Sequence, residues 1–170
     1  MPGAFYFEVA VLLRESMFLN GILTNAEVWH NVKKSEIEEL EELDRSLLRK
    51  ILHVPSTTPK EAFYLELGIL PISVMIKARR CMYLHYLLNL EKSEMIYKFF
   101  ITQWNNPTKG DWSEQVKGDL EEFKIKKDFE EIRKQSKQSF SKLVKNKAKE
   151  NAHEFLNKMK DGHSKMLNVQ

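Results

Sequence analysis

Signals that start a helix recur along the chain, and they constrain the fold more than any other feature. A Ser, Thr or Asp is followed three positions later by Glu at Ser35, Thr58, Asp111 and Asp128. In this pattern the first side chain accepts a hydrogen bond from an amide of the first helical turn. The Glu side chain in return accepts a hydrogen bond from the backbone amide of that first residue. Apolar residues recur at helical spacing between these signals, and strand-like alternation is rare. We therefore predict an all-α fold, an irregular multi-helix bundle of about seven helices.

Proline and glycine positions indicate where these helices begin and end. Pro55 follows the last turn of one helix, and Pro59 lies at the first position of the next. Gly68 suits the left-handed residue that ends a helix, and Pro71 opens a longer one. We expect helices over about 4–19, 35–52, 59–67, 71–90, 93–104, 111–123 and 128–132, and a last helix that starts at Ser136 or Ser139 and ends at Gly162.

The composition indicates a folded chain that does not cross a membrane. Of the 170 residues, 42% are hydrophobic and 30% are charged, unlike disordered or membrane-embedded chains. No segment reaches the ~18 uncharged apolar residues of a membrane span. Glu8 interrupts the apolar N-terminus, which we interpret as a core helix. The single cysteine, Cys81, excludes an internal disulfide. An intracellular location, in the cytoplasm or the nucleus, fits this cysteine usage.

Charge is distributed unevenly along the chain. Six acidic residues and no basic one lie between Glu36 and Asp44, whereas seven basic residues and one acidic residue lie between Glu131 and Lys149. The acids begin a helix, where they complement its dipole, and we interpret them as structural. The late basic run points to a polyanionic partner. Alternatively, the basic run is a solvent-exposed helix face on which lysines occur because they favour helix formation.

The chain carries an ordered series of short motifs. These motifs are Ala26-Glu27-Val28-Trp29, Lys33-Lys34, Leu48-Arg49-Lys50-Ile51-Leu52, Pro55 to Ala62, Leu65 to Pro71, Ile76 to Arg80, Asn106 to Trp112 and His163-Ser164-Lys165. In this order they resemble the region downstream of the catalytic palm in reverse transcriptases of non-LTR (LINE-like) retrotransposons. The resemblance covers nearly the whole chain from about Leu12.

The resemblance implies a non-catalytic part of an RNA-directed DNA polymerase. It would make residues 1–92 a thumb-like helical region and residues 93–170 a C-terminal helical region with a basic last helix. Polymerases of this family carry paired palm aspartates that hold two metal ions, and the chain has no Asp-Asp pair. We therefore expect no enzymatic activity and no cofactor. The implied partners are the backbone of an RNA/DNA template–primer duplex and the missing palm and fingers.

Basic side chains spaced along helices are the candidates for contact with phosphates. The candidate nucleic-acid-binding residues are Lys33, Lys34, Arg49, Lys50, Lys77, Arg79, Arg80, Lys134, Lys137, Lys142 and Lys145. Lys77 and Arg80 would share one helix face. The alternative function is a helical protein-interaction or structural module, a degenerate remnant with no role toward nucleic acid. In that case the apolar N-terminal helix is the expected site of self-association.

Cys81 and His85 are four residues apart on an expected helix, so both could face one ion. A zinc site needs three or four ligands, and no further cysteine exists. We interpret the pair as a buried thiol and a hydrogen-bonded histidine, and we predict neither a metal site nor a catalytic residue.

Overall fold

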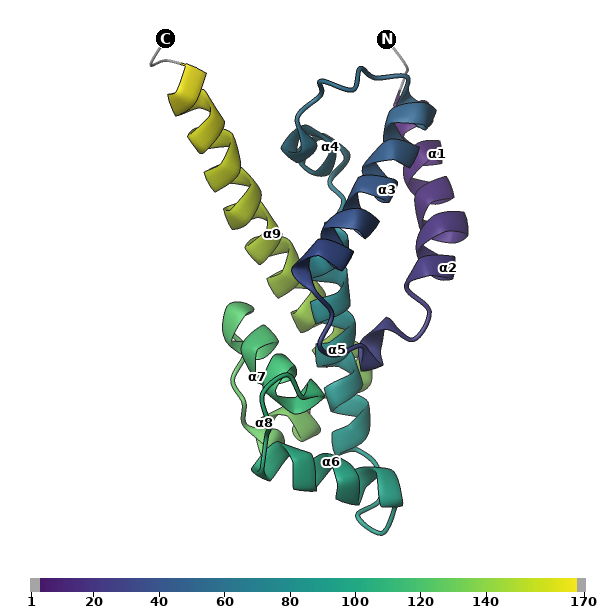
Figure 1. The fold of residues 1–170 in the computed structure, drawn as a ribbon. Helices are drawn as coiled ribbons and strands as arrows, with labels where there is room; N and C mark the ends of the chain where they lie inside the picture. The colour runs from purple at the N-terminus through teal and green to yellow at the C-terminus, as the bar shows by residue number, and fades with distance from the viewer. Residues whose placement is uncertain (1–3, 168–170) are drawn as a thin grey trace. The chain divides into compact units, whose positions relative to one another are not determined.

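The structure is a computed structural model that describes the backbone of residues 4–167 and the side chains of residues 6–158 (Figure 1). This part of the chain contains no strand, and the predicted all-α fold class is confirmed. Its α-helices are α1 (Ala4–Leu13), α2 (Asn20–Ile22), α3 (Lys34–Leu52), α4 (Lys60–Leu67), α5 (Ile72–Leu88), α6 (Met95–Asn105), α7 (Trp112–Glu122), α8 (Phe129–Lys134) and α9 (Lys137–Leu167). A π-helical segment, Arg14–Leu19, joins α1 to α2, and Ala26–Val28 forms a 3-10 turn.

The chain forms two compact units, each built from segments that are distant in sequence. Unit 1 contains residues 1–24, 34–73 and 152–170, and unit 2 contains residues 25–33 and 74–151. Two of the four divisions between the units fall inside α5 and α9. The boundary that we predicted near residue 92 lies within unit 2 and stays a prediction.

Unit 1 packs the apolar sides of α1, α3 and α4 together. Its core contains Ala10, Leu48, Leu52, Phe63, Tyr64, Ile69 and Leu156. α3 is amphipathic, whereas α1 is apolar around nearly its whole circumference. A helix that is apolar on all sides cannot bury every side against one neighbouring helix. As a result Leu12 is 63% exposed, and Met17 in the π-helical segment is 75% exposed.

Unit 2 is organised around aromatic side chains from α5 to α8. The ring of Phe100 lies 5.7–6.3 Å from those of Trp104, Trp112 and Phe129. Tyr83 meets Trp112 edge-on at 5.8 Å. Such tilted and edge-to-face contacts are the favoured geometry for aromatic pairs. Buried aliphatic and aromatic side chains of α7, α8 and α9 complete the core, among them Val116, Leu120, Ile132, Phe140 and Val144.

Several start and stop signals act as predicted. Asp128 accepts hydrogen bonds from the amides of Glu130 and Glu131 at the start of α8. Ser136 Oγ accepts one from the amide of Ser139 before α9. Gly68 follows α4 with a φ of 62°, in the left-handed region that favours glycine.

The clearest differences from the expectation are at α3, at α9 and in the first helix. α3 begins at Lys34, so Ser35 lies inside its first turn rather than before it. The predicted end of the last helix at Gly162 is wrong, because α9 continues to Leu167; one glycine in a helix costs only about 1 kcal/mol. The first helix is interrupted by the π-helical segment, which local sequence patterns do not reveal. The side chains of the motif at 163–165 lie outside the described residues.

Candidate functional site

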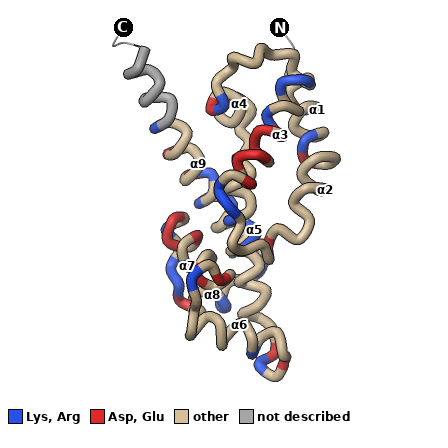
Figure 2. The backbone as a smooth tube through the Cα atoms, in the orientation of Figure 1, with Lys and Arg blue, Asp and Glu red and all other residues tan. Residues whose placement is uncertain are grey.

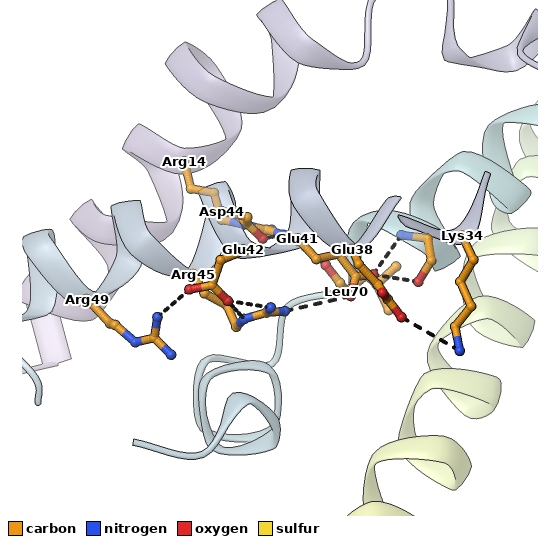
Figure 3. Close-up of polar contacts among 10 residues, drawn as sticks. Arg14, Lys34, Glu38, Glu41, Glu42, Asp44, Arg45, Arg49 and Leu70 are labelled. Atoms are coloured by element: carbon orange, nitrogen blue, oxygen red, sulfur yellow. Dashed lines mark hydrogen bonds and ion pairs between the residues drawn. The ribbon is translucent and has the colours of Figure 1, made fainter. Parts of the chain in front are cut away.

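The candidate cations of α3 lie along a helix that neutralises most of its own charge (Figure 3). Lys34 Nζ lies 3.7 Å from Glu38 on the exposed surface. Arg49 Nη1 donates to Glu42 at 2.8 Å, and its guanidinium lies over the ring of Phe63. Arg45 and Arg49 both donate hydrogen bonds to Glu42, and these bonds hold the pKa of the Glu42 carboxyl below its usual value. Arg49 therefore already has an internal anion to bind.

The acidic run of α3, coloured red in Figure 2, has structural contacts that Figure 3 shows. Asp44 is fully buried and receives two hydrogen bonds from Arg14, at 2.6 and 2.7 Å. Arg14 also donates to the carbonyl of Leu70 at 2.9 Å. Glu41 accepts hydrogen bonds from the amide and the hydroxyl of Ser73. These carboxylates connect α3 to the N-terminal helices and to the start of α5.

On α5, Lys77 and Arg80 share one helix face, as predicted. This face meets carboxylates of α7. Arg80 donates to both oxygens of Asp119 at 2.7 and 3.0 Å, and both side chains are buried. Arg80 also donates to Gln115 Oε1 at 2.9 Å. Lys77 Nζ lies 2.7 Å from Glu122 in a partly exposed pair. Burial raises the pKa of Asp119, and the hydrogen bonds from Arg80 oppose that shift.

The remaining candidates of the first half differ in their surroundings. Lys33 and Lys50 are exposed, and Arg79 is half-buried. Lys50 forms no ion pair or hydrogen bond with any side chain that the structure describes. Lys33 and Arg79 both make polar contacts within the chain. The cations of this half therefore do not form one continuous exposed surface on either unit.

The basic residues of α9 have a different environment. Lys142, Lys145 and Lys149 follow one another at intervals of three and four residues, which places them on one side of the helix. All three are exposed, and none forms an ion pair within residues 6–158. We call these three residues the α9 lysine strip. Phe140, Val144 and Ala148, on another side of α9, are at most 1% exposed.

The other basic residues of this region do not extend the strip. Lys134 ends α8, and Lys137 begins α9; both are exposed. Lys147 pairs with Glu150 at 2.7 Å, on a different side of the helix. Arg133 donates to the carbonyl of Leu88 at 2.6 Å. Lys149 was missing from the predicted site residues, although its distance of seven residues from Lys142 is the signal that places both on one face.

Cys81 and His85 are both buried in unit 2. Burial raises the pKa of the Cys81 thiol. His85 Nε2 lies 2.9 Å from the carbonyl of Gln135, and the ring stacks on Phe140. Among the described side chains no group of three or more His, Cys, Asp or Glu residues could hold a metal ion.

Each unit carries an apolar groove on its described surface. The groove of unit 2 has a volume of about 490 Å³ and lies between α5, α6 and α7, with Tyr83, Phe99 and Trp112 in its wall. The groove of unit 1 has a volume of about 510 Å³ and lies between α1, the π-helical segment and α4. Volumes of this size are typical of sites that bind a ligand or a partner side chain.

Comparison with known proteins assigns the chain to no family. No family model, no curated protein and no solved structure matches it. Within the described residues, no helix has the length and apolar character needed to span a membrane.

Proposed function

We propose that the chain is a non-catalytic helical module that binds the backbone of an RNA/DNA duplex, as the helical region after the palm does in LINE-type reverse transcriptases. The observation that carries this proposal is the α9 lysine strip, three exposed cations on one side of a helix without carboxylate partners among the described residues. A descent from such a polymerase, an intracellular location and the absence of an activity of its own belong to the same proposal.

The spacing of the strip suits contacts with phosphates. Seven residues of helix separate its ends, which corresponds to about 10 Å along the axis. A duplex presents several phosphates over that distance, and each lysine can meet one without reading a base. The arrangement therefore supports affinity without sequence choice.

The cations of α3 and α5 have a smaller part in the proposal. Arg49, Lys77 and Arg80 already bind carboxylates at 2.7–2.8 Å. A phosphate would have to displace those partners, and in the case of Arg80 the displaced carboxylate is buried. We infer that any contact from these helices is secondary to that of α9.

A titration of the chain with a labelled RNA–DNA hybrid tests the proposal. We expect binding that weakens strongly between about 50 mM and about 200 mM salt. The variant Lys142→Gln/Lys145→Gln/Lys149→Gln should lose most of the affinity, and the slope of log K against log salt should fall by up to about 0.9 per lysine. A control variant, Lys60→Gln/Lys92→Gln/Lys109→Gln, removes the same charge from exposed positions outside the strip. Equal losses in both variants, or binding indifferent to salt, would reject the proposal.

The second candidate function is a helical protein-interaction module, and the exposed apolar side chains favour it. Phe7, Leu12 and Met17 are 40%, 63% and 75% exposed on the N-terminal helical stretch of unit 1. Ile96 and Phe99 are 52% and 69% exposed beside the groove of unit 2. Exposed apolar clusters of this kind are typical of interaction surfaces. Self-association through the N-terminal helix is one form of this function, and sedimentation of the chain alone tests it.

A further inference from the structure

The groove of unit 1 combines an apolar floor with an acidic rim. Phe7, Val11 and Leu12 of α1 and Leu67 of α4 supply the apolar surface. Phe7 and Leu12 are exposed, and Val11 and Leu67 are partly buried. The floor therefore offers apolar area that a partner could remove from water, at about 25 cal/mol per Å².

Three exposed carboxylates border this floor. Glu8 and Glu15 come from the N-terminal helical stretch and Glu66 comes from α4. None of them has an ion pair or a hydrogen bond with another described residue. No Lys, Arg or His of the described chain lines the groove. Unlike Glu41, Glu42 and Asp44 of α3, these carboxylates have no partner among the described residues, so their charge is available to an occupant of the groove.

We propose that this groove binds a basic amphipathic helix of a partner protein. Its apolar side would cover Val11, Leu12 and Leu67, and its Lys or Arg side chains would pair with Glu8, Glu15 and Glu66. An apolar helix face laid into a groove is a common mode of peptide recognition, and complementary charge at the rim selects the partner and speeds association.

A second copy that docks through the same face fits this charge less well. A two-fold interface uses the same surface patch of both chains. It would bring the acidic rims of two copies into one interface that contains no Lys, Arg or His from either groove lining, and like charges across an interface oppose binding. This inference specifies the partner for the interaction-module function and does not depend on the binding of nucleic acid.

The test uses the full chain and two short designed helical peptides, one of leucine and lysine and one of leucine and glutamate, labelled for fluorescence anisotropy. We expect the lysine peptide to bind at about 50 mM salt and more weakly at about 200 mM, and the glutamate peptide to bind far more weakly. Glu8→Gln/Glu66→Gln should weaken binding of the lysine peptide about three- to tenfold. The control Glu39→Gln/Glu130→Gln removes the same charge from exposed positions outside the groove and should leave binding unchanged.

A second pair of variants tests the floor. Leu12→Ser should weaken the lysine peptide, whereas Leu43→Ser, at a leucine of similar exposure on α3, should not. Both positions are more than half exposed, so neither substitution should unfold the chain. Both groove variants should retain the hybrid-binding affinity of the unmodified chain, which separates this inference from the nucleic-acid proposal.

Three results would overturn the inference. The first is no binding of the lysine peptide at low salt. The second is equal binding of the two peptides, or an equal loss in groove and control variants. The third is a dimer of the chain alone that Leu12→Ser dissociates, because the occupant would then be a second copy.

Discussion

Arg80 and Asp119 form a two-pronged ion pair in unit 2, with Nε and Nη2 of the arginine 2.7 and 3.0 Å from the two carboxylate oxygens. The residues are 39 positions apart, on α5 and α7, and each is less than 10% exposed. The same guanidinium donates to the carbonyl of Trp29 at 3.3 Å. The pair thus connects both helices to the short segment that precedes α3, and it withdraws Arg80 from solvent.

The loss of one partner from this pair should destabilise the chain strongly. We expect Asp119→Ala to lower the free energy of unfolding by about 3–5 kcal/mol, because it leaves the Arg80 guanidinium buried without its anion. Glu122→Ala removes the partly exposed partner of Lys77 and should cost about 1 kcal/mol or less. Urea denaturation followed by circular dichroism measures both. Equal effects would mean that burial does not distinguish the two pairs.

The contribution of Glu42 to stability should depend on pH. Its pKa lies below 4.5 because Arg45 and Arg49 donate hydrogen bonds to the ionised carboxyl. A group whose pKa is lower in the folded state stabilises the fold above its unfolded-state pKa and loses that contribution as the pH falls through the folded value. Glu42→Gln should therefore be less stable than the unmodified chain at pH 7, and the difference should shrink below about pH 4.5. Denaturation at a series of pH values measures it, and a constant difference would contradict this assignment.

Cys81 should be unreactive toward thiol reagents in the folded chain. The side chain is fully buried, and burial raises the pKa of its thiol, so that little thiolate exists at neutral pH. We expect no modification by an aromatic disulfide reagent under native conditions and one thiol per chain in denaturant, read by absorbance. Fast modification without denaturant would place Cys81 on a surface that opens readily.

Two glycines should respond to alanine in opposite directions. Gly68 has a φ of 62°, and a Cβ there would meet no atom within 4 Å. Gly68→Ala should therefore cost about 1–2 kcal/mol through backbone strain alone. Gly118 lies inside α7, where a Cβ would also meet nothing within 4 Å. Gly118→Ala should stabilise the chain by about 0.5–1 kcal/mol, because it reduces the freedom of the unfolded chain. Thermal denaturation of the two variants tests this contrast.

Local patterns predicted the helices, but they could not predict the surroundings of the candidate cations. The start of α8 at Asp128 and the end of α4 at Gly68 depend on residues within one turn, and both lie where the sequence indicated. The π-helical segment and the continuation of α9 past Gly162 were missed, since no residue within one turn signals them. For the candidate cations, sequence spacing showed which side chains share a face, as for Lys77 and Arg80. It could not show that this face meets acids of α7.

By itself, then, the sequence determined that the chain is helical and where most helices begin and end, because caps, breakers and apolar spacing act over a few residues. Only the tertiary structure decided which charges remain free for a partner. Arg14 meets Asp44 and Arg80 meets Asp119 across 30 and 39 residues, whereas Lys142 and Glu8 meet no opposite charge in the described chain. Such pairings follow from how helices pack, and packing brings together residues whose separation in sequence carries no signal of contact.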